Sequence, residues 1–401
     1  MKRLFITLFF LLSLATLSAQ RSYTLIVSMD GFRWDYSLMY RTPFLDSLSQ
    51  VGVYAQMRPS FPSKTFPNHY TICTGLVPDH HGIIANKFYH RERGVWFSLN
   101  DPETKFDGSF YGGEPIWVTA HKQGKKVGVI YWPGSDTEIQ GIRPDYYHKY
   151  VKGELLTYPE RLDAVERFFN MPEEERPDLV MLYFDEPDHD GHFSNPYSPT
   201  TRATVERMDS IMSDLYHMIK RLPIGDRINL IITSDHGMTP TSPKRLVKIS
   251  DYIKPEWVEY YDYSLPTMIE AKPGCADSIL AVLSDVPHIR AWRKGEVPEY
   301  LQFGTNPNCL DIIVNPDLGW VIGDVYALAP GQHGYDPYEN DMQVAFRAIG
   351  PAFKSGYKKE ELFQNTAIYP LLCHLLGITP APNDGLLDFV KEFLTENEQS
   401  K

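Results

Sequence analysis

The stretch Leu230-Ile231-Ile232-Thr233-Ser234-Asp235-His236-Gly237 joins a strand-like apolar run directly to an aspartate and a histidine. Burying an unpaired Asp-His pair at the end of a strand is costly, because both side chains lose their hydration. A bound cation would offset that cost. The stretch therefore predicts a buried strand whose carboxyl end carries two metal ligands, Asp235 and His236.

Similar segments recur along the chain. The run 23–29 is followed by Asp30, and the apolar run 179–184 leads to Asp188 and His192. Polar groups that follow strands in this way gather beyond the carboxyl ends of an open α/β sheet. Strand-like runs at 23–29, 127–131, 179–184, 228–233 and 343–349 alternate with helix-like segments at 65–76, 114–123, 159–170, 198–221 and 365–377. This alternation predicts an α/β fold with a mostly parallel sheet and helices on both faces.

The segment 240–330 departs from this alternation of strands and helices. It is rich in Pro, Tyr and Trp and contains short alternating stretches at 266–270 and 310–314. We interpret it as a small inserted α+β subdomain. The catalytic α/β core would then comprise 20–239 and 331–395.

The four cysteines are Cys73, Cys275, Cys309 and Cys373. Cys73 and Cys373 fall inside helix-like apolar patterns, so we expect them to be buried free thiols. Cys275 and Cys309 are the one pair that we consider for a disulfide, with free thiols as the alternative.

The first 19 residues have the features of a secretory signal peptide. Lys2 and Arg3 precede an apolar stretch, 4–17, and Ala19 offers a small-residue cleavage site. The stretch is shorter than the roughly 20 apolar residues that a membrane span needs. We therefore expect a secreted or periplasmic protein with no membrane span after removal of the signal.

The chain is acidic. Removal of Lys2 and Arg3 takes its net charge from −12 to −14. A charge of this sign argues against binding of a nucleic-acid duplex through a broad basic surface. A protein of this charge that handles anionic substrates needs a local source of positive charge, which bound metal ions would supply.

Candidate metal ligands come from five separate segments. Carboxylate and imidazole groups without thiolates suit zinc or a similar divalent ion at a catalytic site. Simpler interpretations exist for single segments: Asp30 could cap a turn, 185–190 could be a polar surface loop, and His333 could be a loop histidine. Joint occurrence favours a two-metal site. The candidates are Asp30, Thr65, Asp188, His192, Asp235, His236 and His333.

The hydroxyl of Thr65 has two interpretations. Thr65 could be the N-cap of the predicted helix 65–76, a position where threonine is common. A metal-bound hydroxyl at a helix N-terminus could instead ionise and attack phosphorus. The residues by themselves leave this choice open.

The chain resembles the nucleotide pyrophosphatase/phosphodiesterase family (type I phosphodiesterases) of the alkaline phosphatase superfamily, over essentially all of its length after residue 19. Six motifs carry the resemblance and are highly specific in combination. They are Ser-Met-Asp-Gly-Phe-Arg at 28–33, Pro-Ser-Lys-Thr-Phe-Pro-Asn-His at 62–69, His-Gly-Ile-Ile-Ala-Asn at 81–86, Glu-Pro-Asp-His-Asp-Gly-His at 186–192, Ser-Asp-His-Gly-Met at 234–238 and His-Gly-Tyr-Asp at 333–336.

The resemblance implies an alkaline-phosphatase-like fold, two zinc ions and Thr65 as the nucleophile. Asn86 matches the family's donor to a phosphate oxygen. By the same resemblance, one zinc is held by Asp30, Thr65, Asp235 and His236, and the other is held by Asp188, His192 and His333.

Two further segments resemble the nucleotide-cleaving branch of the family. Phe66 follows Thr65 where that branch places an aromatic ring under the base. Trp132, Asp136 and Tyr150 resemble its opposite pocket wall, and Lys64 is a possible partner for a further phosphate. The alternative is that these aromatic rings pack in the core or in loops.

The resemblance implies a zinc-dependent phosphodiesterase/nucleotide pyrophosphatase, expected to be monomeric, that cleaves nucleotide phosphodiester and pyrophosphate bonds. A threonyl-phosphate ester would form between two in-line displacements. Two enzyme alternatives remain: a choline-headgroup (lysophospholipase C-like) phosphodiesterase and a phosphomonoesterase on the same scaffold. A metal-free binding protein is a third alternative, against which the seven intact ligand positions argue.

Overall fold

The computed structural model of the chain describes residues 21–323 and 329–400. The expected signal peptide, 1–19, lies outside these residues. Within the described ranges, no helix is both long enough and apolar enough to cross a membrane.

A nine-stranded sheet forms the centre of the structure, in the order β18-β2-β17-β8-β1-β7-β5-β6, with β19 paired to β2. Strands β8, β1, β7, β5 and β6 are parallel, and β17 is antiparallel to both β8 and β2. The predicted mostly parallel sheet is confirmed. The strands are β1 (Tyr23–Met29), β2 (Val53–Arg58), β5 (Val127–Ile130), β6 (Tyr146–His148), β7 (Leu179–Phe184), β8 (Ile228–Thr233), β17 (Val344–Ile349), β18 (Tyr357–Lys358) and β19 (Phe363–Gln364).

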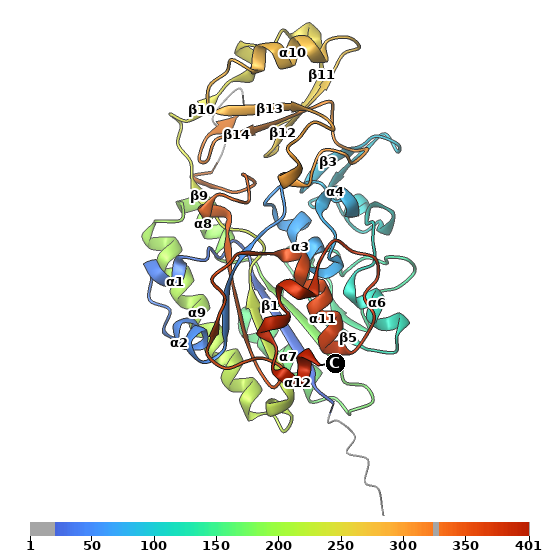
Figure 1. Cartoon of the computed structure of the whole chain (residues 1–401), viewed down its shortest axis with the longest axis vertical. Helices are drawn as coiled ribbons and strands as arrows, with labels where there is room; N and C mark the ends of the chain where they lie inside the picture. The colour runs from blue at the N-terminus through green and yellow to red at the C-terminus, as the bar shows by residue number, and fades with distance from the viewer. Residues whose placement is uncertain (1–20, 324–328, 401) are drawn as a thin grey trace, which may run out of the picture.

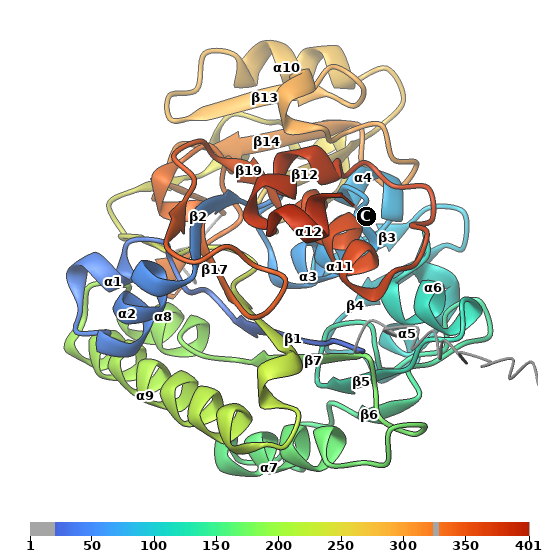
Figure 2. The same ribbon diagram turned by 60° about the horizontal axis from the view of Figure 1, so that its bottom comes forward.

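Helices cover both faces of this sheet, as predicted. Side chains alternate between the faces of a strand, so Ile26 of β1 enters one core and Leu25 and Val27 enter the other. Figure 2 shows α7 and α9 on one side of β1 and β7, with α3 and α11 on the opposite side. The first core takes α3 (Thr65–Thr74), α6 (Ile116–Lys122) and α11 (Ile368–Leu376), and the second takes α2 (Pro43–Val51), α7 (Tyr158–Phe169) and α9 (Pro199–Arg221).

The ends of the predicted helices shift by a few residues. Helix α3 stops at Thr74 because Gly75 adopts a left-handed conformation with φ of +70°, which ends the helix. Strand β2 and helix α2 were not predicted. In β2 the buried and half-buried residues alternate, so polar side chains such as Gln56 interrupt the apolar run.

A second, four-stranded antiparallel sheet forms within 240–330, in the order β11-β12-β14-β13. Helix α10 (Ala276–Leu283) packs against it and shares its separate apolar core. Figure 1 shows this unit at one end of the molecule. The subdomain boundaries at 240 and 330 stay a prediction. The strands are β11 (Val258–Asp262), β12 (Thr267–Ala271), β13 (Ile289–Arg293) and β14 (Ile312–Pro316).

Short elements and 3-10 turns complete the connections. They include α1 (Tyr36–Met39), α4 (Pro78–His81), α5 (Pro102–Lys105), α8 (Asp188–Ser194), α12 (Glu396–Gln399), β3 (Lys87–His90), β4 (Val95–Ser98), β9 (Thr239–Pro240), β10 (Leu246–Val247), β15 (Val321–Ile322) and β16 (Gly331–Gln332).

All four cysteines are free in the structure. The disulfide considered between Cys275 and Cys309 therefore does not form. Cys309 is buried, with its Sγ 3.7 Å from Oδ1 of Asp79, whereas Cys275 is half-buried at the start of α10. Cys73 and Cys373 are buried free thiols, as predicted.

Candidate metal centre

Three carboxylates follow the carboxyl ends of β8, β1 and β7. Asp30 follows β1 directly, Asp235 follows β8, and Asp188 begins α8 after β7. Strand β1 is hydrogen-bonded in parallel to both of the other strands. The three side chains therefore meet at one edge of the sheet, where α/β proteins place their functional groups.

Gly31 allows the segments of Asp30 and Asp188 to touch. Its φ is +67°, and a Cβ at this position would lie 2.9 Å from both Cα and Cβ of Asp188. The backbone N–H of Asp188 donates to the carbonyl of Asp30 at 3.0 Å. A side chain at residue 31 would separate these two segments, so glycine is required here.

Asp30, Asp235 and His236 form one group whose ligand atoms lie within 4.8 Å of one another. Nε2 of His236 is 3.4 Å from Oδ1 of Asp30 and 3.1 Å from Oδ2 of Asp235. The hydroxyl of Thr65 lies 3.1 Å from the same nitrogen. The structure thus brings together the four residues predicted for the first metal.

Asp188, His333 and His236 form a second group within the same 4.8 Å limit. Oδ1 of Asp188 is 3.6 Å from Nε2 of His333, and its Oδ2 is 3.5 Å from Nε2 of His192. The rings of His236 and His333 stack with their centroids 3.6 Å apart. The residues predicted for the second metal therefore also meet, and His236 borders both groups.

The three histidines share one hydrogen-bonding pattern. A backbone carbonyl can only accept, so each Nδ1 carries a proton, and in the neutral form of each ring Nε2 carries a lone pair. Nε2 of His192 and Nε2 of His333 lie 3.1 Å apart. Two facing lone pairs repel unless a cation binds both. The carbonyl contacts are His192 to Gly331 at 2.8 Å, His236 to Gly237 at 2.9 Å and His333 to Ser63 at 2.8 Å.

The carboxylates also favour a cation. Oδ1 of Asp30, Oδ1 of Asp188 and Oδ2 of Asp235 are buried without a hydrogen-bond partner. Burial and, after it, the charges of neighbouring carboxylates raise the pKa of Asp30 and of Asp235, the latter to about 8. Unpartnered buried carboxylates are unstable unless a proton or a positive charge compensates them.

Burial lowers the pKa of His236 and of His333 well below the usual range, so both rings are neutral. Neutral imidazole is the form that binds metals. The residues of this site therefore fit zinc or a similar divalent ion by donor type, protonation state and unsatisfied atoms.

Two supporting residues were not identified from the sequence. Tyr183 of β7 donates its hydroxyl to Oδ2 of Asp30 at 2.7 Å. His69 of α3 lies 2.9 Å from the carbonyl of Thr65 and 3.3 Å from Oδ2 of Asp235. Such contacts orient the groups that bind a metal. The only signal for Tyr183 was a hydroxyl within an otherwise apolar strand.

Thr65 is not the N-cap of its helix. Lys64 occupies that position, without a capping hydrogen bond from its side chain, and Thr65 is the first helical residue. Nearby, Oδ1 of Asn86 accepts the backbone N–H of Phe66 at 3.0 Å. With Oδ1 used as an acceptor, the two amide hydrogens of Asn86 are the side-chain groups that could donate to a phosphate oxygen.

Two of the predicted substrate-binding aromatic residues are buried. Phe66 is 5% exposed and packs near Phe97 and Tyr111, with ring centroids 6.2 and 6.5 Å away. Trp132 is 1% exposed and donates its Nε1–H to the carbonyl of His69 at 3.0 Å. These contacts are those of core packing, so a role in base binding stays a prediction for both residues.

The structure brings Asp136 and Tyr150 together. Oδ2 of Asp136 accepts the backbone N–H of Tyr150 at 3.3 Å and lies 3.3 Å from Nζ of Lys105. Lys105, which the sequence did not single out, also lies 5.0 Å from the ring centroid of Tyr150. The ring of Tyr150 is 6.4 Å from that of Tyr183, so this cluster adjoins the metal centre.

Glu186, His189 and Asp190 form a third group of ligand types, more exposed than the other two. Its carboxylates already accept hydrogen bonds, since Glu186 accepts from the Asp190 backbone and Asp190 accepts from Thr204. Neither carboxylate has the buried, unpartnered oxygen found in the other two groups. We therefore do not assign a metal to it.

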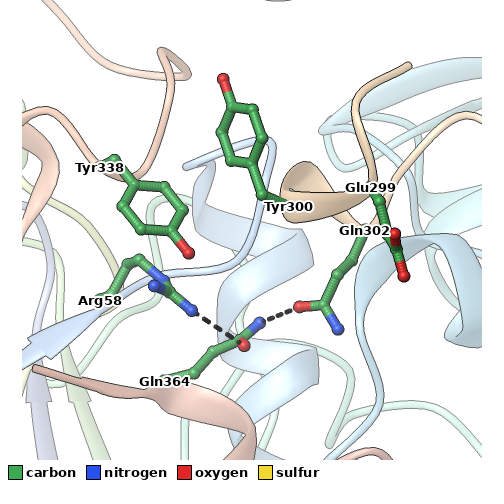
Figure 3. A pocket seen from close by; sticks show the side chains of 6 residues that line it. All are labelled: Arg58, Glu299, Tyr300, Gln302, Tyr338 and Gln364. Atoms are coloured by element: carbon green, nitrogen blue, oxygen red, sulfur yellow. Dashed lines mark hydrogen bonds between the residues drawn. The ribbon is translucent and has the colours of Figure 1, made fainter.

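A separate surface hollow of about 460 Å³ lies between the end of β2 and the segment 299–302 (Figure 3). Arg58 donates to Gln364 at 3.2 Å, and Gln364 donates to Gln302 at 2.7 Å. None of the predicted site residues lines this hollow, so we do not assign it to the candidate metal centre. Its lining is Arg58, Glu299, Tyr300, Gln302, Tyr338 and Gln364.

Comparison with known proteins agrees with these observations. Residues 24–336 match the sequence model of the family described as type I phosphodiesterase / nucleotide pyrophosphatase. Human ectonucleotide pyrophosphatase/phosphodiesterase family member 5 is 36% identical over 393 residues, which is 96% of this chain and 81% of that protein. Rat member 7 is 36% identical over 91% of this chain and 86% of its own length. Human member 1 is also 36% identical, but this chain spans only 40% of its length.

Solved structures show the same relationship. Murine member 5, determined as an inactive threonine-to-alanine variant in complex with AMP, superimposes with a TM-score of 0.88 at 34% identity. The match covers 93% of this chain and 100% of that one. Human member 5 also gives a TM-score of 0.88, at 35% identity, over 94% of this chain and 100% of its own.

Proposed function

Because the chain belongs to the type I phosphodiesterase/nucleotide pyrophosphatase family of phosphodiester-bond hydrolases, we propose that it is an exported zinc enzyme that cleaves nucleotide phosphodiester and pyrophosphate bonds. The reaction would pass through a phosphate ester on Thr65. The observation that carries this proposal is the placement of the Thr65 hydroxyl 3.1 Å from Nε2 of His236, beside two buried carboxylate–imidazole groups.

The role of Thr65 as nucleophile has two supports. Its side chain does not cap the helix, so its hydroxyl is available at the metal centre. The murine relative determined with AMP is an inactive threonine-to-alanine variant. A hydroxyl at a helix N-terminus also lies where free amides favour an anionic substrate.

The proposed chemistry consists of two displacements at phosphorus. In the first, the oxygen of Thr65 forms a bond to phosphorus and the bond to the leaving oxygen breaks. In the second, the oxygen of a water molecule attacks the same phosphorus, and the bond to Thr65 breaks, which restores the hydroxyl. Asn86 would donate an amide hydrogen to a nonbridging oxygen as negative charge develops there.

Asp30, Thr65, Asp235 and His236 would hold one zinc ion, and Asp188, His192 and His333 would hold the other. Bound divalent ions supply Lewis-acid stabilisation of the negative charge on the attacking and leaving oxygens. Export is proposed from the features of residues 1–19, and a monomeric state is proposed for the mature protein.

The substrate class is tested by comparing three substrates under identical conditions. We expect the para-nitrophenyl ester of thymidine monophosphate to be cleaved with a higher kcat/KM than glycerophosphocholine or para-nitrophenyl phosphate. The three substrates represent a nucleotide diester, a choline diester and a monoester. Faster cleavage of glycerophosphocholine would favour the choline-headgroup alternative, and faster cleavage of the monoester would favour a phosphatase.

Phe66→Ala or Tyr150→Ala should reduce kcat/KM for a nucleotide diester by roughly ten- to a hundredfold, because stacking on an aromatic ring is worth roughly 1–3 kcal/mol per base. The loss on a bis-aryl phosphodiester, which has no base, should be much smaller. Equal losses on both substrates would mean that these rings act in packing, and would remove the argument for a base pocket.

A further inference from the structure

Asn68, in the first turn of α3, is fully buried, and its side-chain amide uses every hydrogen-bonding position that it has. Its Nδ2 donates to the carbonyl of Pro62 and to the carbonyl of Lys64, both at 2.9 Å. Its Oδ1 accepts from the backbone N–H of Ser60 at 2.7 Å and from Nδ2 of Asn365 at 2.9 Å. An asparagine amide offers two donors and two acceptor positions, so none is left unused.

The surroundings fix this orientation of the amide. Carbonyls can only accept and a backbone N–H can only donate, so an exchange of Oδ1 and Nδ2 would break these bonds. Asn365 is also fully buried, and its Oδ1 accepts the hydroxyl of Ser60 at 2.8 Å. The two asparagines therefore hold the segment 60–64, which leads into α3, at Ser60, Pro62 and Lys64.

This segment contacts residues of both proposed metal groups. The carbonyl of Lys64 that Asn68 binds belongs to the peptide bond between Lys64 and Thr65. The carbonyl of Ser63, one residue earlier, accepts the Nδ1–H of His333 at 2.8 Å. A shift of the segment would therefore move the hydroxyl of Thr65 relative to His333 and to the metal centre.

Resting on the proposed function, we infer that Asn68 is a positioning residue for the nucleophile. Its amide would hold the segment 60–64 so that the hydroxyl of Thr65 stays in the attacking position beside His236. Asn68 would touch neither the substrate nor a metal ion, and would act only through the backbone that precedes Thr65.

The physical reason is that attack at phosphorus depends steeply on position. A displacement of about 1 Å can cost on the order of a hundredfold in rate. The segment does not depend on Asn68 for all of its hydrogen bonds, because the carbonyl of Pro62 also accepts the N–H of Lys64 at 2.8 Å. Removal of the amide should therefore loosen the segment without unfolding it.

The test is the single-turnover rate of Asn68→Ala with the para-nitrophenyl ester of thymidine monophosphate and excess enzyme. Release of para-nitrophenol reports the first displacement, the step in which Thr65 attacks. We expect this rate to fall roughly ten- to a hundredfold. The zinc content and the dissociation constant for AMP should stay near the wild-type values, because the carboxylate and imidazole ligands lie on other segments.

Hydrogen exchange supplies a measurement that does not depend on activity. The peptide that contains residues 60–66 should exchange faster in Asn68→Ala than in the wild type, because the amide bonds that restrain it are lost. If Asn68→Ala does not fold, as judged by thermal unfolding, Asn68→Asp replaces it. This variant keeps the shape of the side chain and loses Nδ2, and the same changes are expected of it.

Asn229→Ala is the matched control. Asn229 is a fully buried asparagine of β8 whose Oδ1 accepts the backbone N–H of Ala352 at 2.9 Å. It lies near the start of the strand, whereas Asp235 follows the end. Its replacement should lower the melting temperature but leave the single-turnover rate and the exchange of 60–66 unchanged.

The two proposals fail in different ways. If the wild type does not cleave the nucleotide ester, the proposed function is wrong and the role of Asn68 falls with it. If the wild type cleaves it and folded, zinc-loaded Asn68→Ala does so at the same single-turnover rate, only the role of Asn68 is overturned. An equal fall in Asn229→Ala would also overturn it, because the loss would then follow stability and not position.

Discussion

Thr65→Ala is expected to reduce kcat by on the order of 10⁴-fold or more while the protein still folds and binds metal, as is typical for removal of a nucleophile. A nucleophile acts in the chemical step, so turnover should fall far more than binding of a nucleotide product such as AMP. The measurements are steady-state kinetics with a nucleotide aryl ester, the equilibrium dissociation constant for AMP and elemental analysis for zinc.

Thr65→Ser is the matched control for this prediction. Serine keeps a hydroxyl at the same place beside His236, so part of the activity should remain. If Thr65 acted only as a residue of its helix, its replacement by alanine, which has the higher helix propensity, would leave turnover near normal. Near-normal turnover of Thr65→Ala would therefore reject the covalent mechanism.

Exhaustive chelation is expected to abolish turnover, and added zinc is expected to restore it. The reason lies in the buried oxygens of Asp30, Asp188 and Asp235 that have no hydrogen-bond partner, and in the facing Nε2 atoms of two histidines. Metal loss should also lower the melting temperature, because a ligand that binds only the folded state stabilises it. Full activity in protein shown to be metal-free by elemental analysis would exclude metal-dependent catalysis.

Substitution of two histidines of α8 distinguishes the proposed second metal site from the exposed group of Glu186, His189 and Asp190. His192→Ala should lose zinc, because Nε2 of His192 faces the other ligands. His189→Ala, three residues earlier on the same helix, removes the same ring from a side chain that is 62% exposed. It should keep the wild-type zinc content. Loss of zinc only in His189→Ala would move the assignment to the exposed group of Glu186, His189 and Asp190.

The amino-acid sequence by itself determined the main strands of the central sheet and the set of candidate ligands. Fully buried strands such as β1 and β8 are largely apolar, so they stand out as runs, and charged residues just beyond their ends stand out in turn. Asp30 and Asp235-His236 were identified in this way. The spacing Asp188-x-x-x-His192 was visible because one helical turn brings such residues together.

Edge elements were harder to predict. In β2, buried and half-buried positions alternate along the strand, so polar and apolar residues mix. Its pairing with β17, β18 and β19 depends on segments about 290 to 310 residues away. No local pattern carries information about such a partner.

Only the tertiary structure decided the contacts around the ligands. The proton positions of His192 and His333 depend on carbonyl groups of distant residues, Gly331 and Ser63. The bond from Tyr183 to Asp30 likewise joins segments that are far apart in the chain. Sequence reports which chemical groups are present, whereas burial and hydrogen bonding arise only when the folded chain removes water and fixes neighbours.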